Sequence, residues 1–386
     1  MPNEALEGWR TRSLGSVIDF INGFAFKPED WCDAGTPIIR IQNLNGSDTF
    51  NHFNGDIPER YHVNAGDLLF CWSGSRGTSF GARKWSGSLG YLNQHIFRCE
   101  VSRDLDDDFA FYLLEGMTGA IEAEAHGGGG LVHIKKSEIV KFEASLPPLD
   151  EQRRIAEVLR SVDEAIAAAG HVVSGLESAA SEIAERAFVD PDAVEPDCEV
   201  ATFGDLFDIK GGNQPPKSSF VYEPKEGYVR LLQIRDFESD DKAAYITETS
   251  TKARCEADDI LIARYGASVG RILTGKAGAY NVALTKIVFR DGRMARRYAY
   301  HWLKSEYFQD RIRAVSNRSA QAGFNKEDLF PTKIALPTME AQRDIAEALD
   351  DIEKAVWANR TQREQLIELK SALLDDLLSG RVRVPA

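Results

Sequence analysis

The stretch LPPLDEQRRIAEVL at residues 146–159 decides the fold, because it returns with most of its residues as LPTMEAQRDIAEAL at residues 336–349. The two copies start at 146 and 336, so the offset is close to half of the 386-residue chain. Solenoid repeats have periods of about 20–50 residues, so this repeat is too long to be one. We interpret it as a duplicated module, in which a globular domain is followed by a long helix.

Each half of the chain opens with about 140 residues of short apolar runs, such as PIIRI at residues 37–41 and KIVFR at residues 286–290. Asn-Gly, Gly-Ser and Pro turns separate these runs, which is typical of strands and loops. Shorter helices are predicted at residues 107–122 and 294–315. The sequence therefore predicts a domain of strands and small helices in each half.

A heptad pattern follows the first copy of the repeat. Apolar or Ala residues recur there at alternating spacings of four and three, which keeps one face of a helix toward a partner helix. This seam consists of Ile155, Leu159, Val162, Ile166, Ala169, Val173, Leu176, Ala180, Ile183 and Ala187. Pro147 and Pro148 block extension upstream, Asp150 is a candidate N-cap, and Pro191 closes the far end.

The second helix opens on the same seam with Ile345, Leu349, Ile352 and Val356. The next heptad positions of this helix include polar residues, and the leucines from Leu369 to Leu377 are expected to depart from strict register. The simplest way to bury both seams is against each other, so an antiparallel coiled coil is predicted. The alternative is that each helix packs only on its own domain.

The fold class is therefore α+β, with two similar domains separated by two long helices. The expected boundaries are 1–148 for the first domain and 149–190 for the first spacer helix. The second domain is expected at 191–337, the second spacer helix at 338–380 and a tail at 381–386.

Composition limits the class of protein. The sequence offers no apolar run long enough for a bilayer span and no secretory signal, and its five cysteines lack the spacing of a zinc site. The net charge of −14 argues against nucleic acid, but residues 252–318 carry 14 Lys or Arg against 6 Asp or Glu. Residues 150–190 carry 9 acidic and 4 basic residues, so part of the negative charge lies on the first long helix.

Two similar domains held apart by a stiff spacer suit a target with two separated marks, such as DNA half-sites about 34 Å apart. The chain also resembles the specificity subunits of type I restriction–modification systems along essentially its whole length. The resemblance rests on NGFAFK at 22–27, IRIQNL at 39–44, NAGDLLF at 64–70 and the two helix openings. The second half departs from it, with GGNQPP at 211–216 in place of the Gly-Phe-Ala-Phe-Lys stretch.

This resemblance implies that each domain reads one half of a bipartite site in double-stranded DNA. It also implies two kinds of partner. Two modification subunits bind S-adenosylmethionine and methylate adenine, and restriction subunits use ATP and Mg. The chain itself is then not an enzyme, holds no cofactor or metal, and acts in the bacterial cytoplasm at the nucleoid, with no membrane contact.

Candidate DNA-binding residues are the Arg, Lys and polar side chains beside aromatics after two corresponding strands. Arg pairs with guanine, and Asn or Gln with adenine, by geometry. The candidates are Trp72, Ser73, Ser75, Arg76, Arg83 and Lys84 in the first half, and Arg264, Tyr265, Ser268, Arg271, Lys276 and Arg318 in the second.

Two other functions remain to be weighed. GRILTGKA at residues 270–277 nearly matches a phosphate-binding P-loop, but Ala277 lacks the hydroxyl that would ligate magnesium. We find no motif for methyl transfer, so an enzyme is disfavoured. The main alternative is a coiled-coil scaffold that joins proteins without reading DNA.

Overall fold

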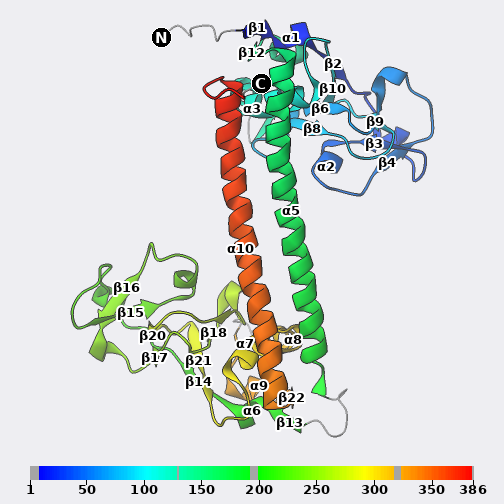
Figure 1. Ribbon diagram of the computed structural model, residues 1–386. Helices are drawn as coiled ribbons and strands as arrows, with labels where there is room; N and C mark the ends of the chain where they lie inside the picture. The colour runs from blue at the N-terminus through cyan, green and yellow to red at the C-terminus, as the bar shows by residue number, and fades with distance from the viewer. Residues whose placement is uncertain (1–7, 128–129, 192–198, 317–322, 385–386) are drawn as a thin grey trace. The chain divides into compact units, whose positions relative to one another are not determined.

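The computed structural model describes residues 8–127, 130–191, 199–316 and 323–384. The chain forms two compact units, unit 1 (residues 1–170 and 361–386) and unit 2 (residues 171–360). We call the globular part of unit 1 lobe 1 (residues 8–148) and that of unit 2 lobe 2 (residues 199–338). Two long helices, α5 and α10, contribute one part of their length to each unit (Figure 1).

Lobe 1 contains two four-stranded sheets, one antiparallel and one in which β3 and β9 run parallel. The antiparallel sheet has the order β2 (Ile18–Asn22), β10 (Ile96–Val101), β6 (Leu68–Cys71), β8 (Gly81–Lys84). The mixed sheet has the order β4 (Asn51–Phe53), β3 (Thr36–Ile39), β9 (Gly90–Leu92), β5 (His62–Val63). Two strand pairs complete the lobe: β1 (Arg10–Ser13) with β12 (Glu143–Leu146), and β7 (Ser73–Ser75) with β11 (Leu131–His133).

Lobe 2 repeats both four-stranded sheets and the first of the two strand pairs, whereas the β7–β11 pair is replaced, among the described residues, by an isolated bridge between Tyr265 and Gly323. Its antiparallel sheet has the order β14 (Phe207–Gly211), β21 (Leu284–Phe289), β18 (Leu261–Ala263), β19 (Ile272–Leu273). Its mixed sheet has the order β16 (Ala244–Thr247), β15 (Tyr228–Leu232), β20 (Gly278–Tyr280), β17 (Arg254–Cys255), and β13 (Glu199–Thr202) pairs with β22 (Lys333–Leu336). The duplicated domain predicted from the sequence is therefore confirmed.

Short helices connect the strands in both lobes. Lobe 1 has α1 (Leu14–Val17), α2 (Ile41–Leu44), α3 (Asp107–Glu124) and α4 (Lys136–Ile139). Lobe 2 has α6 (Phe203–Leu206), α7 (Arg296–Lys304), α8 (Glu306–Ser316) and α9 (Lys326–Leu329). Asp106 caps α3 by accepting hydrogen bonds from the backbone N–H groups of Asp108 and Phe109, both at 3.1 Å.

The single helix predicted at residues 294–315 is wrong, because the helix breaks at Ser305. This residue has extended backbone angles (φ −63°, ψ 151°). Its side-chain hydroxyl donates to the carbonyl of Trp302 at 2.6 Å, which ends α7, and its own carbonyl accepts from the N–H of Gln309 in α8. Serine competes for backbone hydrogen bonds in this way, which the apolar periodicity alone does not reveal.

Each lobe packs its core directly against the long helices. Phe20, Phe70 and Phe97 lie in one buried cluster with Ile155 and Leu159 of α5. In lobe 2 the aromatic residues Phe203, Trp302 and Phe308 lie in one buried cluster with Ala346 and Leu349 of α10. The start of each long helix is thus part of its lobe's core.

The heptad seam predicted for α5 (Leu149–Ala187) is buried or half-buried at every position from Ile155 to Ala187. In α10 (Met339–Leu378) the heptad positions from Ile345 to Leu377 are buried or half-buried except Arg363, which is exposed. Leu369 leaves the seam, as expected, whereas Leu373 and Leu377 lie on it. The register passes through Lys370 instead of Leu369, which is 47% exposed. The leucine spacing did not predict a lysine at this seam position.

The two long helices run antiparallel wherever they meet within a unit, as predicted. In unit 1, Asp163 of α5 contacts Lys370 of α10, and Gly170 lies near Arg363. In unit 2, Glu177 forms an ion pair with Arg360. Positions that rise along α5 thus meet positions that fall along α10.

Lys370 is held on the seam by two carboxylates. Its ammonium group lies 2.7 Å from Glu115 of α3 and 2.8 Å from Asp163, and its side chain is only 13% exposed. The Tyr112 hydroxyl donates to the other Asp163 oxygen at 2.9 Å, and the Tyr112 ring lies 5.4 Å from the ammonium nitrogen. Burial, together with Asp163, raises the pKa of Tyr112. A buried lysine of this kind stabilises only the register that supplies its partners.

A buried glutamine joins each lobe to the helix that follows it. The Gln152 side chain accepts from the N–H of Asp106 at 2.8 Å and donates to the carbonyls of Pro147 (2.9 Å) and Asp104 (3.1 Å). Gln342 repeats all three bonds with Ala295 (2.8 Å), Pro337 (3.0 Å) and Arg293 (2.9 Å). Both side chains are 1% exposed. The repeated glutamine of the sequence is therefore a structural clamp.

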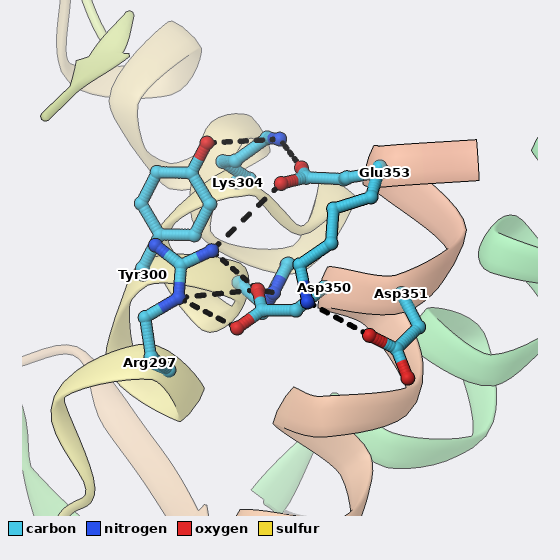
Figure 2. Close-up of polar contacts among 8 residues, drawn as sticks. Arg297, Tyr300, Lys304, Asp350, Asp351 and Glu353 are labelled. Carbon is cyan, nitrogen blue, oxygen red and sulfur yellow. Dashed lines mark hydrogen bonds and ion pairs between the residues drawn. The ribbon is translucent and has the colours of Figure 1, made fainter. Parts of the chain in front are cut away.

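Further along α10, ion pairs join the helix to α7 in unit 2 (Figure 2). Arg297 of α7 contacts Asp350 of α10 through its Nε at 2.9 Å, and His301 contacts the same carboxylate at 2.7 Å. Lys304 pairs with Glu353 one turn further along α10. Burial opposes ionisation of Asp350, but hydrogen bonds from Arg297 and His301 outweigh it and hold its pKa below the usual value.

The charges at this junction are reversed between the two units. In unit 1 the acid, Asp108, is on the lobe and the base, Arg160, is on α5, with 3.8 Å between them. In unit 2 the equivalent positions are Arg297 on the lobe and Asp350 on α10. Each lobe is therefore electrostatically matched to its own helix.

We predict that Gln152→Ala lowers the free energy of unfolding by about 3 kcal/mol, because one partly buried N–H, one partly buried carbonyl and one buried carbonyl lose their partner. Gln365→Ala, at an exposed position of α10, is the matched control and should change stability by less than about 0.5 kcal/mol. Urea unfolding of the full chain measures both. Equal stability of the two variants would contradict the clamp.

Candidate nucleic-acid interface

The predicted residues of lobe 1 lie on and around the β6–β8 segment. Trp72 directly follows β6, where its ring stacks on Phe97 with 5.6 Å between centroids. Ser73 and Ser75 are the ends of β7. Arg76 donates to the carbonyl of Glu122 at 3.1 Å, which ties the loop after β7 to α3.

Arg83 and Lys84 on β8 already have protein partners. Arg83 donates to the carbonyls of Ala82 and Thr78 at 2.7 and 3.1 Å. Lys84 forms an ion pair with Asp108 and lies 5.9 Å from the centre of the Phe111 ring. These two cations thus help to hold the lobe together, and the positive charge of Lys84 is neutralised by Asp108.

In lobe 2, Arg264 and Tyr265 directly follow β18. Arg264 donates through Nε to the carbonyl of Phe324 at 3.0 Å, and its guanidinium stacks on the ring of Tyr265 at 5.0 Å. Tyr265 is 38% exposed. Ser268 closes the short turn that follows. Arg318 lies outside the described residues.

A pair of acidic residues neutralises the other predicted cations of lobe 2. Arg271 pairs with Glu238 at 2.5 Å. Lys276 and Arg230 share Asp240, and their hydrogen bonds lower the pKa of that carboxyl to about 2. Asp240 therefore stays ionised at any pH at which duplex DNA is handled. The local excess of basic residues in the sequence overstates the positive charge of this surface.

A hollow in lobe 1 was missed by the sequence analysis. It measures about 250 Å³ and its lining includes Trp31, Arg40, Gln94 and His95. Arg40 stacks over the Trp31 ring at 5.0 Å and donates to Asn51 at 2.9 Å. Its residues come from four separate chain segments, of which NGFAFK at 22–27 and IRIQNL at 39–44 were noticed only as part of a resemblance.

His301, Asp350 and Glu353 place their ligand atoms within 4.8 Å of one another, which is metal-ligand spacing. Arg297 and Lys304, however, already neutralise the two carboxylates. A divalent cation would meet two positive charges there, so the cluster functions as an ion-pair junction.

Comparison with known proteins identifies the family. The profile described as "Type I restriction modification DNA specificity domain" matches residues 6–171 and again residues 195–369. The chain belongs to this family. The resemblance noted from the sequence is thereby confirmed, and both halves of the chain carry the domain.

Several relatives match along nearly the whole chain. The MjaVIII specificity subunit of a type I restriction enzyme from Methanocaldococcus jannaschii is 22% identical, covering 98% of this chain and 94% of the relative. The EcoBI specificity subunit from Escherichia coli is 26% identical, covering 90% and 79%. A crystal structure of the type I S subunit from M. genitalium has the same fold, with a TM-score of 0.66 at 19% identity over 98% of this chain and 97% of that one.

Among the described residues, every helix is too short or too polar to cross a lipid bilayer.

We predict that Asp240→Asn strengthens non-specific DNA binding if this surface of lobe 2 faces the duplex, because it frees one net positive charge from neutralisation. The slope of log K against log salt should become steeper by about one unit. Asp241→Asn is the control, since its exposed side chain neutralises neither Arg230 nor Lys276. Fluorescence anisotropy with a fixed duplex over a salt series distinguishes the two, and identical slopes would place this surface away from DNA.

Proposed function

We propose that this chain is the sequence-reading subunit of a type I restriction–modification complex, in which each lobe reads one half of a bipartite site in double-stranded DNA. The observation that carries the proposal is the duplication. Two lobes with the same strand order are each clamped by a buried glutamine to one of two antiparallel helices. A protein with two copies of one reading domain suits a target with two separated marks.

In this proposal the recognition domains are residues 1–148 and 191–337. The helical segments 149–190 and 338–380 are the spacers that set the distance between the two half-sites. The DNA-binding residues are those named from the sequence, with Arg264 and Tyr265 foremost, because a guanidinium held on an aromatic ring is preorganised for a planar partner.

The chain has no catalytic role in this proposal. Adenine methylation from S-adenosylmethionine takes place in two modification subunits, and ATP- and Mg-dependent cleavage takes place in restriction subunits. The complex works in the bacterial cytoplasm, at the nucleoid. The names of the relatives support this assignment, since they are called specificity subunits of type I restriction enzymes.

The test is to sequence the methylated bases in the genome of a host that expresses the chain with its modification partner. We expect methyl-adenine in one motif made of two short half-sites around a spacer of fixed length, and none when this chain is omitted. Methylation at the same motif without the chain, or a partner bound without any methylated motif, would favour a scaffold that does not read DNA.

A further inference from the structure

The two lobes provide an internal comparison, because the strand pairing makes their positions equivalent one by one. In lobe 1, Ile39 of β3 pairs in parallel with Leu92 of β9. In lobe 2, Leu232 of β15 pairs in the same way with Tyr280 of β20. The residues that follow these four strand ends are therefore equivalent between the lobes.

The backbone at this edge of the mixed sheet is the same in both lobes. Asn93 donates its N–H to the carbonyl of Ile39 at 3.1 Å, and Asn281 does so to Leu232 at 3.0 Å. A glycine of each lobe packs closely against the backbone of this asparagine. A Cβ on Gly23 would lie 2.1 Å from the Asn93 carbonyl oxygen, and a Cβ on Gly212 would lie 1.9 Å from the Asn281 carbonyl oxygen. Only glycine fits there, so both lobes build the same scaffold.

The side chains presented on this scaffold differ in their hydrogen-bonding chemistry at four positions. Each position follows the end of a paired strand, or lies between β9 and β10 or between β20 and β21. The pairs are Arg40 and Gln233, Trp72 and Arg264, Gln94 and Val282, and His95 and Ala283.

In lobe 1, Arg40, Gln94 and His95 line the hollow, and the Trp72 ring packs beside His95 with 5.5 Å between centroids. Polar atoms without partners lie in the same region. Trp72 Nε1, Asn93 Oδ1 and Gln94 Oε1 are buried without a hydrogen bond, and Asn93 as a whole is 6% exposed. Partial burial and the nearby Arg40 lower the pKa of His95, which favours its neutral form. Unpaired buried polar atoms are destabilising, so several of them beside one hollow point to a hydrogen-bonding ligand.

In lobe 2 the same edge is simpler. Arg264 replaces the indole of Trp72, Val282 is 43% exposed in place of Gln94, and Nε2 of Gln233 is buried without a partner. This edge offers one guanidinium and one amide, whereas lobe 1 offers a guanidinium, an imidazole and amide carbonyls.

We infer that these four paired positions are the base-reading positions of the two lobes and that they bind the edges of base pairs in a duplex. The inference rests on the proposed function and names its reading residues. Arg40 in lobe 1 and Arg264 in lobe 2 donate to guanine, the partner that fits a guanidinium in the major groove. Because the other positions differ, the two half-sites have different sequences.

The test uses the full chain assembled with its modification partner. Arg40→Gln installs the residue of lobe 2 in lobe 1. The preference for the wild-type base at one position of one half-site should fall roughly 5- to 150-fold, while the other half-site stays unchanged. Arg40→Lys keeps the charge but loses the bidentate geometry, so it should retain overall affinity and lose the same base preference. Arg103→Gln, at an exposed position of lobe 1, is the matched control and should leave both half-sites intact.

The measurement is methylation of duplexes that carry the wild-type motif or each single substitution in it. Unchanged base preference in Arg40→Gln and Arg40→Lys would overturn the inference, and so would equal weakening on all duplexes, which marks a phosphate contact. A wild-type complex without any sequence preference would instead defeat the proposed function itself, so the two failures are distinguishable.

Discussion

The buried glutamine at the start of each long helix is the interaction on which the rest of the structure depends. Gln152 and Gln342 each satisfy one backbone N–H and two carbonyls at the point where lobe, proline turn and helix meet. A buried side chain that makes three hydrogen bonds fixes the orientation of the helix start relative to its lobe, because any rotation leaves polar groups unpaired. Base reading needs such a fixed orientation, since side chains must meet base edges to within hydrogen-bond distance.

Charged groups further along the long helices make the two junctions between lobe and helix different from each other. An apolar seam alone allows neighbouring registers, whereas Lys370 finds Glu115 and Asp163 in one register only. Exchanging the lobes between the junctions would bring Asp108 toward Asp350 and Arg297 toward Arg160. Like charges at partly buried positions are unfavourable, so the charges at the junctions favour the observed order of the lobes along the chain. A fixed order suits two lobes that present different side chains from the same scaffold.

The sequence predicted the features that depend on periodicity and repetition. The duplicated domains, the two long helices and their antiparallel seam all follow from the repeat at residues 146 and 336 and from the heptad spacing. The structure differs where polar side chains act against the periodic pattern. Ser305 breaks a predicted helix by hydrogen bonding to the backbone, and Lys370 occupies a seam position that the leucine spacing did not predict.

The candidate site was harder to predict, because it depends on contacts between residues far apart in the sequence. Arg271 is paired with Glu238 and Lys84 with Asp108, so their charge is not free as the local composition suggested. The hollow of lobe 1 combines Trp31, Arg40 and His95 from separate segments. The equivalence of Trp72 and Arg264 was visible from the sequence only as two residues that follow similar strands.

In the proposed function each lobe reads one DNA half-site, and the two long helices set the distance between the half-sites. The most direct test inserts one heptad into α5 after Ser174 and one into α10 after Arg360, which keeps the seam in register and lengthens each helix by about 10 Å. The account predicts that the methylated motif keeps both half-sites and gains about three base pairs of spacer, given a rise of about 3.4 Å per base pair. Altered half-sites around a spacer of unchanged length would contradict it.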